Sequence, residues 1–220
     1  MIWDWSYAWE VLPVLGDAAI VTIKATVVGY LFALVGGLIL ALMRRSPTRA
    51  LAWPAAFLVE FVRSTPLLVQ LFFLFFGLPE LGIRLSPFAT GVVGLGLHFS
   101  TYTSEVYRSG IDGVARGQWE GAKALNFSTY RCYRAVVLPQ AIPPIVPVLG
   151  NYLLTMFKDS TLLSAIAVME LLQVAKILGS DTFRYMEPLT IVGVFFIVMS
   201  VVSATGISWL ERKLNPRRSA

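Results

Sequence analysis

Long apolar stretches without charge dominate the pattern of the chain. No Asp, Glu, Lys or Arg occurs in residues 25–43, 85–104, 135–157 and 188–210. Each stretch is close to the ~20 residues that a helix needs to cross a hydrocarbon core of ~30 Å. The pattern therefore predicts an all-α polytopic membrane protein with about five spanning helices, at residues 17–43, 49–76, 88–107, 140–166 and 188–211.

The second predicted span contains two charged residues, Glu60 and Arg63. Two charges at a helix centre cost about 5–7 kcal/mol, whereas roughly twenty apolar positions return about 6–12 kcal/mol, so insertion remains favourable. A spacing of three residues places both side chains on one helix face, where they can pair. Charged groups at this depth face a bundle interior or a water-filled cavity. We favour an ion pair that fixes helix packing, and the alternative is that both residues line a polar path.

Basic residues are distributed unevenly between the two sides of the predicted spans. Eleven of them follow the first, third and fifth spans: Arg44, Arg45, Arg49, Arg116, Lys123, Arg131, Arg134, Arg212, Lys213, Arg217 and Arg218. The connections on the other side contain only Arg84, Lys176 and Arg184. The positive-inside rule then places the amino terminus outside and the carboxyl terminus in the cytoplasm. We expect an interfacial segment at residues 1–16, a membrane domain at 17–213 and a cytoplasmic tail at 214–220.

Composition supports this class and excludes others. The chain is 56% hydrophobic and 14% charged, with one cysteine, Cys132, and one histidine, His98. A single residue of each type excludes an intrachain disulfide framework and a multi-histidine metal site, so no metal site is expected. We interpret His98 as a satisfied core histidine. The net charge of +5 is assigned to cytoplasmic loops rather than to nucleic-acid binding.

A helical hairpin is predicted in the long cytoplasmic loop at about 108–139. A short helix at about 118–125 should stop at Asn126, because asparagine accepts the left-handed conformation that ends many helices. Ser128 can then cap a second helix that starts at Thr129 and ends before Pro139. The alternative interpretation is an amphipathic hairpin that lies on the membrane surface.

This hairpin resembles the EAA loop of permease subunits of binding-protein-dependent ABC importers, whose pattern is E-A-A-x(3)-G followed by L-P. The corresponding residues are Glu120-Gly121-Ala122, Asn126 and Leu138-Pro139. Residues 60–79, 104–125 and the run from Lys158 to Leu163 are similar to the polar amino acid (histidine/glutamine/glutamate-type) uptake permeases of that group. The tryptophan-rich amino terminus is similar to the related ectoine/hydroxyectoine branch.

The resemblance implies a bacterial inner-membrane subunit and a division of labour. A second permease subunit, identical or homologous, would complete the path; a cytoplasmic ATPase dimer would bind ATP and Mg; and an extracytoplasmic binding protein would deliver substrate. The chain contains no G-x-x-x-x-G-K-[ST] loop, so it lacks the usual phosphate-binding loop of an ATPase. We therefore expect that this chain is not an enzyme and that it binds no cofactor. The residues that the resemblance assigns to ATPase coupling are Gly117, Gln118, Glu120, Gly121, Ala122, Leu125, Asn126 and Pro139.

Two departures from the family pattern occur in the hairpin. Gly121 replaces the second EAA alanine, which should loosen that helix by roughly 0.5–1 kcal/mol. Asn126 replaces the usual glycine and keeps the capacity for a left-handed turn. These departures leave room for a subfamily-specific groove on the ATPase.

Charged and polar residues of the spans are candidates for the substrate path or for gating: Glu60, Arg63, Thr65, Gln70, Glu105, Arg108, Lys158 and Asp159. Lys158 and Asp159 are sequence neighbours that do not share a helix face, so we expect them to pair with different helices or to meet a zwitterion. Glu105 and Arg108 form either a gate or a helix-end salt bridge.

The sequence therefore favours an ABC importer permease for a polar amino acid or related zwitterion, working by alternating access, with an ectoine-type solute as the alternative substrate. The alternative is a protein of a different class, an ion-coupled secondary transporter, in which Glu60, Asp159 and Glu105 would couple transport to an ion gradient. Such carriers often have internal inverted repeats, and none is visible in the sequence. A membrane-embedded enzyme is disfavoured because no cluster of His, Cys and acidic residues is present.

Overall fold

The computed structural model describes residues 3–214, and every regular element within them is a helix. Residues 215–220 of the predicted tail lie outside the described residues. The α-helices are α1 (Trp5–Arg44), α2 (Arg49–Arg63), α3 (Leu67–Phe72), α4 (Pro87–Asp112), α5 (Arg116–Ala124), α6 (Thr129–Cys132), α7 (Leu138–Asp159), α8 (Leu171–Thr182) and α9 (Met186–Leu214). The all-α prediction is confirmed.

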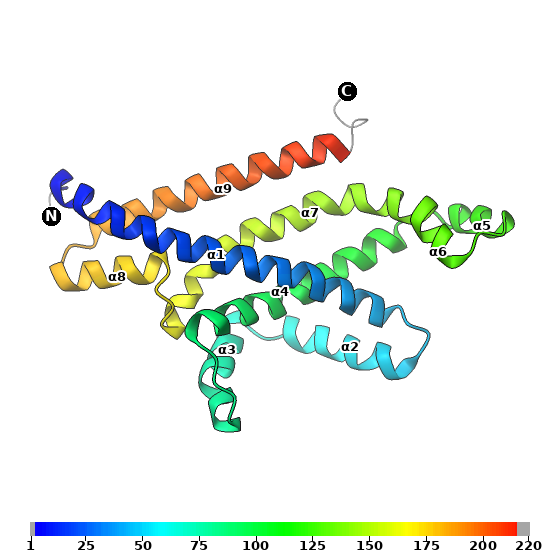
Figure 1. The fold of residues 1–220 in the computed structure, drawn as a ribbon, viewed down its shortest axis with the longest axis horizontal. Coiled ribbons are helices and arrows are strands. Elements are labelled where there is room, and N and C mark those ends of the chain that lie inside the picture. Colours follow the sequence, from blue (N-terminus) through cyan, green and yellow to red (C-terminus); the bar gives the residue numbers. More distant parts are fainter. Residues whose placement is uncertain (1–2, 215–220) are drawn as a thin grey trace.

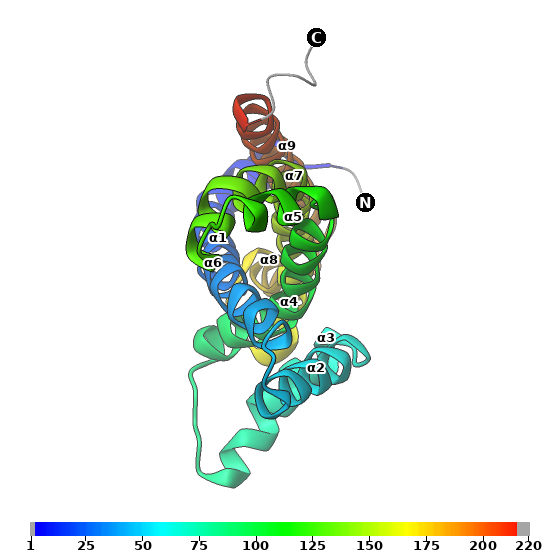
Figure 2. The ribbon, with the colours of Figure 1, turned by 90° about the vertical axis from the view of Figure 1, so that its right-hand side faces the viewer.

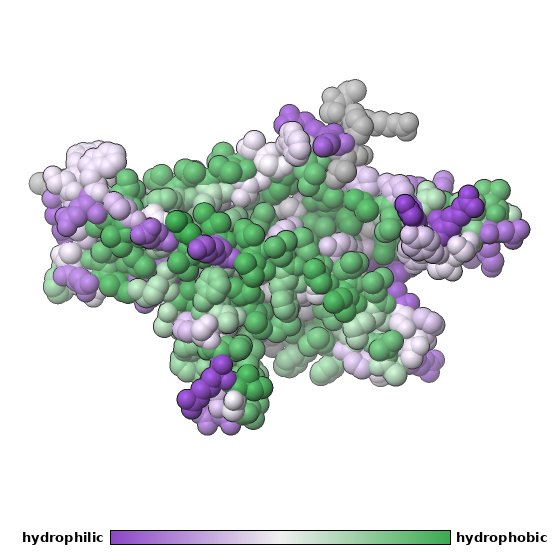
Figure 3. Space-filling view, viewed as in Figure 1, coloured by the Kyte–Doolittle hydropathy of each residue, from purple (hydrophilic) through white to green (hydrophobic). Residues whose placement is uncertain are grey.

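Four long helices run roughly along the long axis of the molecule. Figure 1 shows α1, α4, α7 and α9 in this arrangement, with the α5–α6 hairpin beyond one end and α8 beside the amino-terminal half of α1. The turned view in Figure 2 shows α1, α4 and α7 around a common centre, while α2 and α3 lie to one side. Apolar residues cover much of the visible surface over the long helices, and polar residues gather toward both ends (Figure 3). This distribution is typical of helices that are surrounded by lipid.

Three helical stretches of the described chain are long and apolar enough to cross a membrane, at Trp5–Arg44, Thr129–Ile166 and Met186–Lys213. The bent pair Arg49–Arg63 and Leu67–Leu81 would be a fourth. The helix predicted at 88–107 is present as α4 but does not pass this test. Its polar side chains are instead buried within the molecule, at Thr90, Ser100, Thr101, Thr103 and Ser104.

The prediction of one continuous helix at 49–76 is wrong. The chain bends by 107° between α2 and the segment that begins at Leu67. Pro66 causes this break, because it has an extended ψ of 138° and no N–H with which to continue the helix. The residue before a proline also disfavours the helical conformation. After α3, a π-helical turn (Phe73–Gly77) and a 3₁₀ turn (Leu78–Leu81) complete the segment.

One predicted boundary also differs from the structure, and one helix was not predicted. The first helix begins at Trp5 rather than near residue 17, because Asp4 caps it by accepting the Ser6 amide N–H at 2.9 Å. The fourth span ends in a 3₁₀ segment at Ser160–Ile166, and the short helix α8 that follows was not predicted. Its start is capped by the buried Glu170 carboxylate, which accepts two backbone N–H groups.

A clasp of charged residues holds the amino end of α1 to the connection between α8 and α9. Arg184 pairs with Asp4 at 3.0 Å and with Glu187 at 2.8 Å, and its guanidinium lies 5.1 Å from the Tyr7 ring centre. The hydrogen bond from Arg184 lowers the pKa of Asp4 below its ordinary 3.8, with a smaller contribution from the Tyr7 backbone N–H. Asp4 therefore stays ionised, and can keep its pair with Arg184, at a lower pH than an aspartate with the ordinary pKa would.

The contact between α1 and α4 is built on small residues. A Cβ atom at Gly37 would lie 2.9 Å from the Ser100 carbonyl oxygen and closer still to Thr103 Oγ1. The Thr103 hydroxyl donates a hydrogen bond to the Ala33 carbonyl at 2.7 Å. Glycine is thus required at position 37 for the backbones to approach closely enough for this interhelical bond.

Replacing Gly37 by leucine is expected to destabilise the fold by about 1–3 kcal/mol or more, because the α4 backbone has no room for a side chain. The measurement is thermal unfolding of the purified protein in detergent. Gly16→Leu on the same helix is the matched control, since no atom lies within 4 Å of a Cβ at Gly16. Equal losses in both variants would contradict the close-packing argument.

Candidate functional site

The tip of the predicted hairpin has the expected geometry. Asn126 has a left-handed φ of 55°, and the following Phe127 N–H donates to the Ala122 carbonyl at 3.0 Å. Ser128 accepts the Arg131 backbone N–H at 3.3 Å and caps α6. The left-handed turn and the serine cap are therefore confirmed.

The hairpin has its own small core. Ala122 is 4% exposed and packs in a cluster with Cys132, Val137 and Ile111. Ala122 therefore supports the hairpin from within. Its assignment to ATPase coupling stays a prediction.

Four other predicted coupling residues lie in α5 or, for Leu125, directly after it. We call Gly117, Glu120, Gly121 and Leu125 the coupling face, because spacings of three, four and eight residues bring them to one side of a helix. All four are exposed, and Leu125 is 70% exposed. No atom lies within 4 Å of a Cβ at Gly117 or Gly121. A partner surface can approach the backbone closely at both glycines.

The hairpin continues directly into the fourth span. We predicted that the helix after Thr129 ends before Pro139, and this is wrong. A π-helical turn at Tyr133–Val137 joins α6 to α7, so that Pro139 falls in the first turn of α7. Pro139 has no N–H for the helical hydrogen-bond ladder, and the π-helical turn stands directly before it in the continuous stretch Thr129–Ile166. Gln118 contributes a second link, accepting a hydrogen bond from Gln140 Nε2 at 3.3 Å.

Polar contacts gather at the break between α2 and α3. The Gln70 amide nitrogen lies 2.7 Å from Thr65 Oγ1 and 2.7 Å from the Val62 carbonyl oxygen. The Gln70 amide oxygen lies 3.1 Å from His98 Nδ1 on α4. His98 is thus a satisfied core histidine, as predicted, and Gln70 ties the broken segment to α4.

The predicted ion pair between Glu60 and Arg63 does not form. Arg63 ends α2 and turns to α4, where its guanidinium lies 5.2 Å from the Tyr102 ring centre and 3.7 Å from Glu105 Oε1. Glu60 is exposed and has no ion-pair partner within residues 3–214. Arg63 contacts Glu105 rather than Glu60 because α2 ends at Arg63, where it lies against α4.

Arginines outnumber carboxylates where α1, α2 and α4 meet. Glu105 pairs with Arg44, Arg63 and Arg108, and Asp112 pairs with Arg45 and Arg108. The predicted pair of Glu105 with Arg108 is confirmed, at 2.8 Å. We call these four arginines and two carboxylates the arginine cluster. Its net charge is +2.

Lys158 and Asp159 lie apart from this cluster, at the carboxyl end of α7. Neither side chain forms an ion pair in the described part of the chain, so the predicted pairs with other helices are wrong. The 3₁₀ turn that begins at Ser160 redirects the chain here. Lys158 is exposed and Asp159 is partly exposed. Within residues 3–214, no group of three His, Cys, Asp or Glu residues could hold a metal ion.

An all-helical membrane architecture with an exposed hairpin at one end is thus the class that the fold defines. Residues 33–216 match the family of binding-protein-dependent transport system inner membrane components. The chain belongs to this family.

Two relatives and one solved structure match nearly the whole chain. A probable amino-acid ABC transporter permease protein of Sinorhizobium fredii is 44% identical, over 97% of this chain and 92% of the relative. The arginine transport system permease protein of Bacillus subtilis is 34% identical, over 96% and 97%. A chain from the crystal structure of an amino acid ABC transporter with histidines superposes with a TM-score of 0.91 at 34% identity, covering 97% of this chain and all of that one.

Replacing Gln70 by leucine is expected to lower the free energy of unfolding by about 1–3 kcal/mol, because the buried His98 ring loses its partner. Thermal unfolding in detergent measures this change. Asn151→Leu is the control, because Asn151 is exposed and its side-chain amide forms no hydrogen bond within the described residues, so a change within about 0.5 kcal/mol is expected. An unfolding temperature unchanged by Gln70→Leu would show that this contact does not hold the break in place.

Proposed function

We propose that the chain is the permease subunit of an ABC importer that takes up a polar amino acid or a related zwitterion by alternating access. The family membership and the amino-acid, arginine and glutamine transporters among its relatives support the substrate class. The main support for ATP-driven coupling is the coupling face. It is exposed to a partner, and a continuous helix connects it to the membrane domain. ATP hydrolysis belongs to a partner ATPase dimer.

The hairpin transmits ATPase movement as a lever. The coupling face docks in a groove on the ATPase, with Leu125 as its apolar contact. The π-helical turn and α7 then carry the displacement over 22 further residues, about 33 Å at 1.5 Å per residue. The displacement reaches Lys158 and Asp159 at the far end of α7.

The arginine cluster attracts the substrate carboxylate. Arg63 is the member best placed to bind it, since its contact with Glu105 is 3.7 Å, longer than the 2.8 Å pair of Arg108. A carboxylate that approaches Arg63 forms a shorter, charge-assisted hydrogen bond and competes with this loose pair. The exposed Glu60 and the partly exposed Asp159 are available to the substrate ammonium group. Thr65 and Gln70 hold the break in shape.

Five spans with the amino terminus outside complete the proposal. α4 crosses as an inner span despite its polar residues, because their hydroxyls donate to backbone carbonyls, as from Ser100 to Gly96 at 2.7 Å and from Ser104 to Thr101 at 2.7 Å. A hydroxyl satisfied in this way can be buried in a bundle. A second permease, identical or homologous, completes the path, and an extracytoplasmic binding protein delivers the substrate.

Glu120→Lys tests the coupling face. We expect insertion and assembly to be retained and ATP-driven uptake in proteoliposomes to fall by about tenfold or more, because the variant reverses the charge of a surface that couples two subunits. Arg116→Gln is the matched control, since it removes the same 3.2 Å ion pair with Glu120, which is worth only about 0.3–0.5 kcal/mol. Normal uptake by Glu120→Lys, or equal loss in both variants, would refute the assignment.

Arg63→Gln tests the substrate path. The readout is ATPase activity of the complete transporter in nanodiscs, with histidine, glutamate, glutamine, arginine and ectoine added in turn. We expect the stimulating ligand to be needed at about 10- to 100-fold higher concentration, because a charge-assisted hydrogen bond is lost. Arg84→Gln, on the loop before α4, should leave this concentration unchanged.

Two outcomes would contradict the proposal. An unchanged response of Arg63→Gln would remove Arg63 from the path. Uptake driven by an ion gradient without any ATPase would instead support a secondary transporter.

A further inference from the structure

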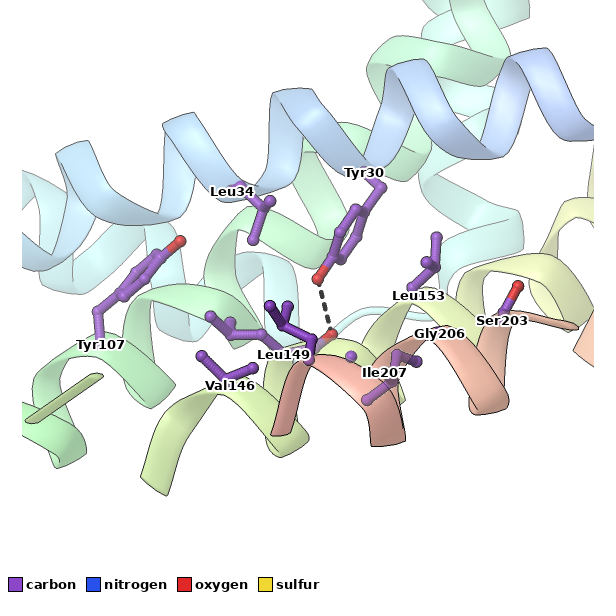
Figure 4. A pocket seen from close by; sticks show the side chains of 11 residues that line it. Tyr30, Leu34, Tyr107, Val146, Leu149, Leu153, Ser203, Gly206 and Ile207 are labelled. Carbon is purple, nitrogen blue, oxygen red and sulfur yellow. Dashed lines mark hydrogen bonds between the residues drawn. The ribbon is translucent and has the colours of Figure 1, made fainter. Parts of the chain in front are cut away.

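A cavity of about 490 Å³ lies where α1, α4, α7 and α9 approach one another. Figure 4 shows Tyr30 and Leu34 pointing from α1 toward α7 and α9, which contribute Leu149 and Gly206. We call this space the α9 cavity. Of its eleven lining residues, only Tyr30, Tyr107 and Ser203 have a polar side chain, and none is charged.

The lining of the α9 cavity does not suit an amino acid. The Tyr30 hydroxyl already donates to the Leu149 carbonyl at 2.9 Å, so it is not free to bind a carboxylate. A zwitterion brought here would lose its hydration without gaining an ionic partner, which is strongly unfavourable. The α9 cavity is therefore separate from the proposed substrate path, and its chemistry fits a hydrocarbon chain.

Two neighbouring positions on α9 explain why the space is open. A Cβ atom at Gly150 of α7 would lie 2.8 Å from Ile207 Cγ1, so α9 is held tightly against α7 at this point. One residue earlier, no atom lies within 4 Å of a Cβ at Gly206. Empty space next to apolar side chains forfeits dispersion contacts, and apolar cavities bind apolar molecules rather than water.

The dimensions of the α9 cavity match one leaflet. Its lining extends on α9 from Ser203 to Leu210, about 10 Å at 1.5 Å per residue. Half of a hydrocarbon core of ~30 Å is ~15 Å. An acyl chain that enters at the Leu210 end would therefore run along most of its own leaflet.

An aromatic residue and two basic residues flank Leu210 at the end of α9. Trp209 is 58% exposed, and Lys213 Nζ lies 5.2 Å from its ring centre. Arg212 is exposed and donates to the Ser208 carbonyl at 3.3 Å, which leaves its other N–H groups free to donate elsewhere. Glu211 offsets one of these two positive charges. Tryptophan is typical of the headgroup level, and basic residues there attract anionic lipids.

We propose that the α9 cavity holds one acyl chain of an anionic phospholipid, from the leaflet at the carboxyl end of α9, with its phosphate bound by Arg212 and Lys213. The bound chain fills the space beside Gly206 and supports α9 against α1 and α7. This site is distinct from the substrate path and does not depend on which substrate is carried.

The test uses the complete transporter in nanodiscs that contain a trace of phosphatidylglycerol or phosphatidylcholine with a photoreactive diazirine in the acyl chain. Labelled residues are mapped by mass spectrometry. We expect phosphatidylglycerol to label the lining of the α9 cavity, and Gly206→Leu to abolish this labelling by filling the space. Gly193→Leu is the matched control on the same helix, because a Cβ there also has no neighbour within 4 Å and Gly193 does not line the cavity.

The headgroup contact is tested separately. Arg212→Gln and Lys213→Gln should each lower labelling by phosphatidylglycerol about fivefold, the equivalent of roughly 1 kcal/mol per basic residue, and leave labelling by phosphatidylcholine unchanged. Ser203→Leu fills the cavity from another position and should act like Gly206→Leu, which guards against a folding defect in one variant.

Three results would overturn the proposal. The first is labelling that persists in both filled variants. The second is equal labelling by the two lipids in the unaltered protein, which would remove the anionic headgroup. The third is absence of lipid labelling together with crosslinks from α9 to a second permease subunit, which would assign the cavity to that subunit.

Discussion

The close contact between α1 and α4 is the constraint on which the rest of the structure depends. Gly37 lets the two backbones approach until Thr103 donates to the Ala33 carbonyl. Once the helices are in this register, the carboxyl end of α1 lies beside the last turns of α4. Arg44 and Arg45 then reach Glu105 and Asp112. The arginine cluster is therefore a consequence of helix packing, because the sequence places its members up to 68 positions apart.

The break at Pro66 decides where the side chains of α2 and α3 lie. A continuous helix from Arg49 would carry Gln70 past α4, whereas the bend brings its side chain to His98. The same bend ends α2 at Arg63 and aims this residue at Tyr102 and Glu105. One proline thus creates both the polar contacts that hold the segment and the loosely paired arginine that we propose binds substrate.

At Pro139, in contrast to Pro66, the helix is not interrupted. Here a π-helical turn precedes the proline, and the helix passes from the hairpin into α7 without a break. Pro66 follows a turn that ends a helix, while Pro139 follows a π-helical turn inside the continuous helical stretch Thr129–Ile166. The chain is therefore interrupted where α2 meets α4 and continuous where the coupling face joins the membrane domain.

The sequence by itself determined the helical class, the apolar spans and the turn at Asn126 and Ser128, because hydropathy and capping act over a few neighbouring residues. The family motif also located the hairpin. Only the tertiary structure decided which charges pair and which small residues are buried. Arg63 pairs with Glu105 rather than with Glu60, and Ala122 lies in the hairpin core. It also decided that α4, which the sequence predicted from its lack of charge, buries its hydroxyls inside the molecule. Such outcomes depend on distances between residues remote in sequence, and no local pattern encodes them.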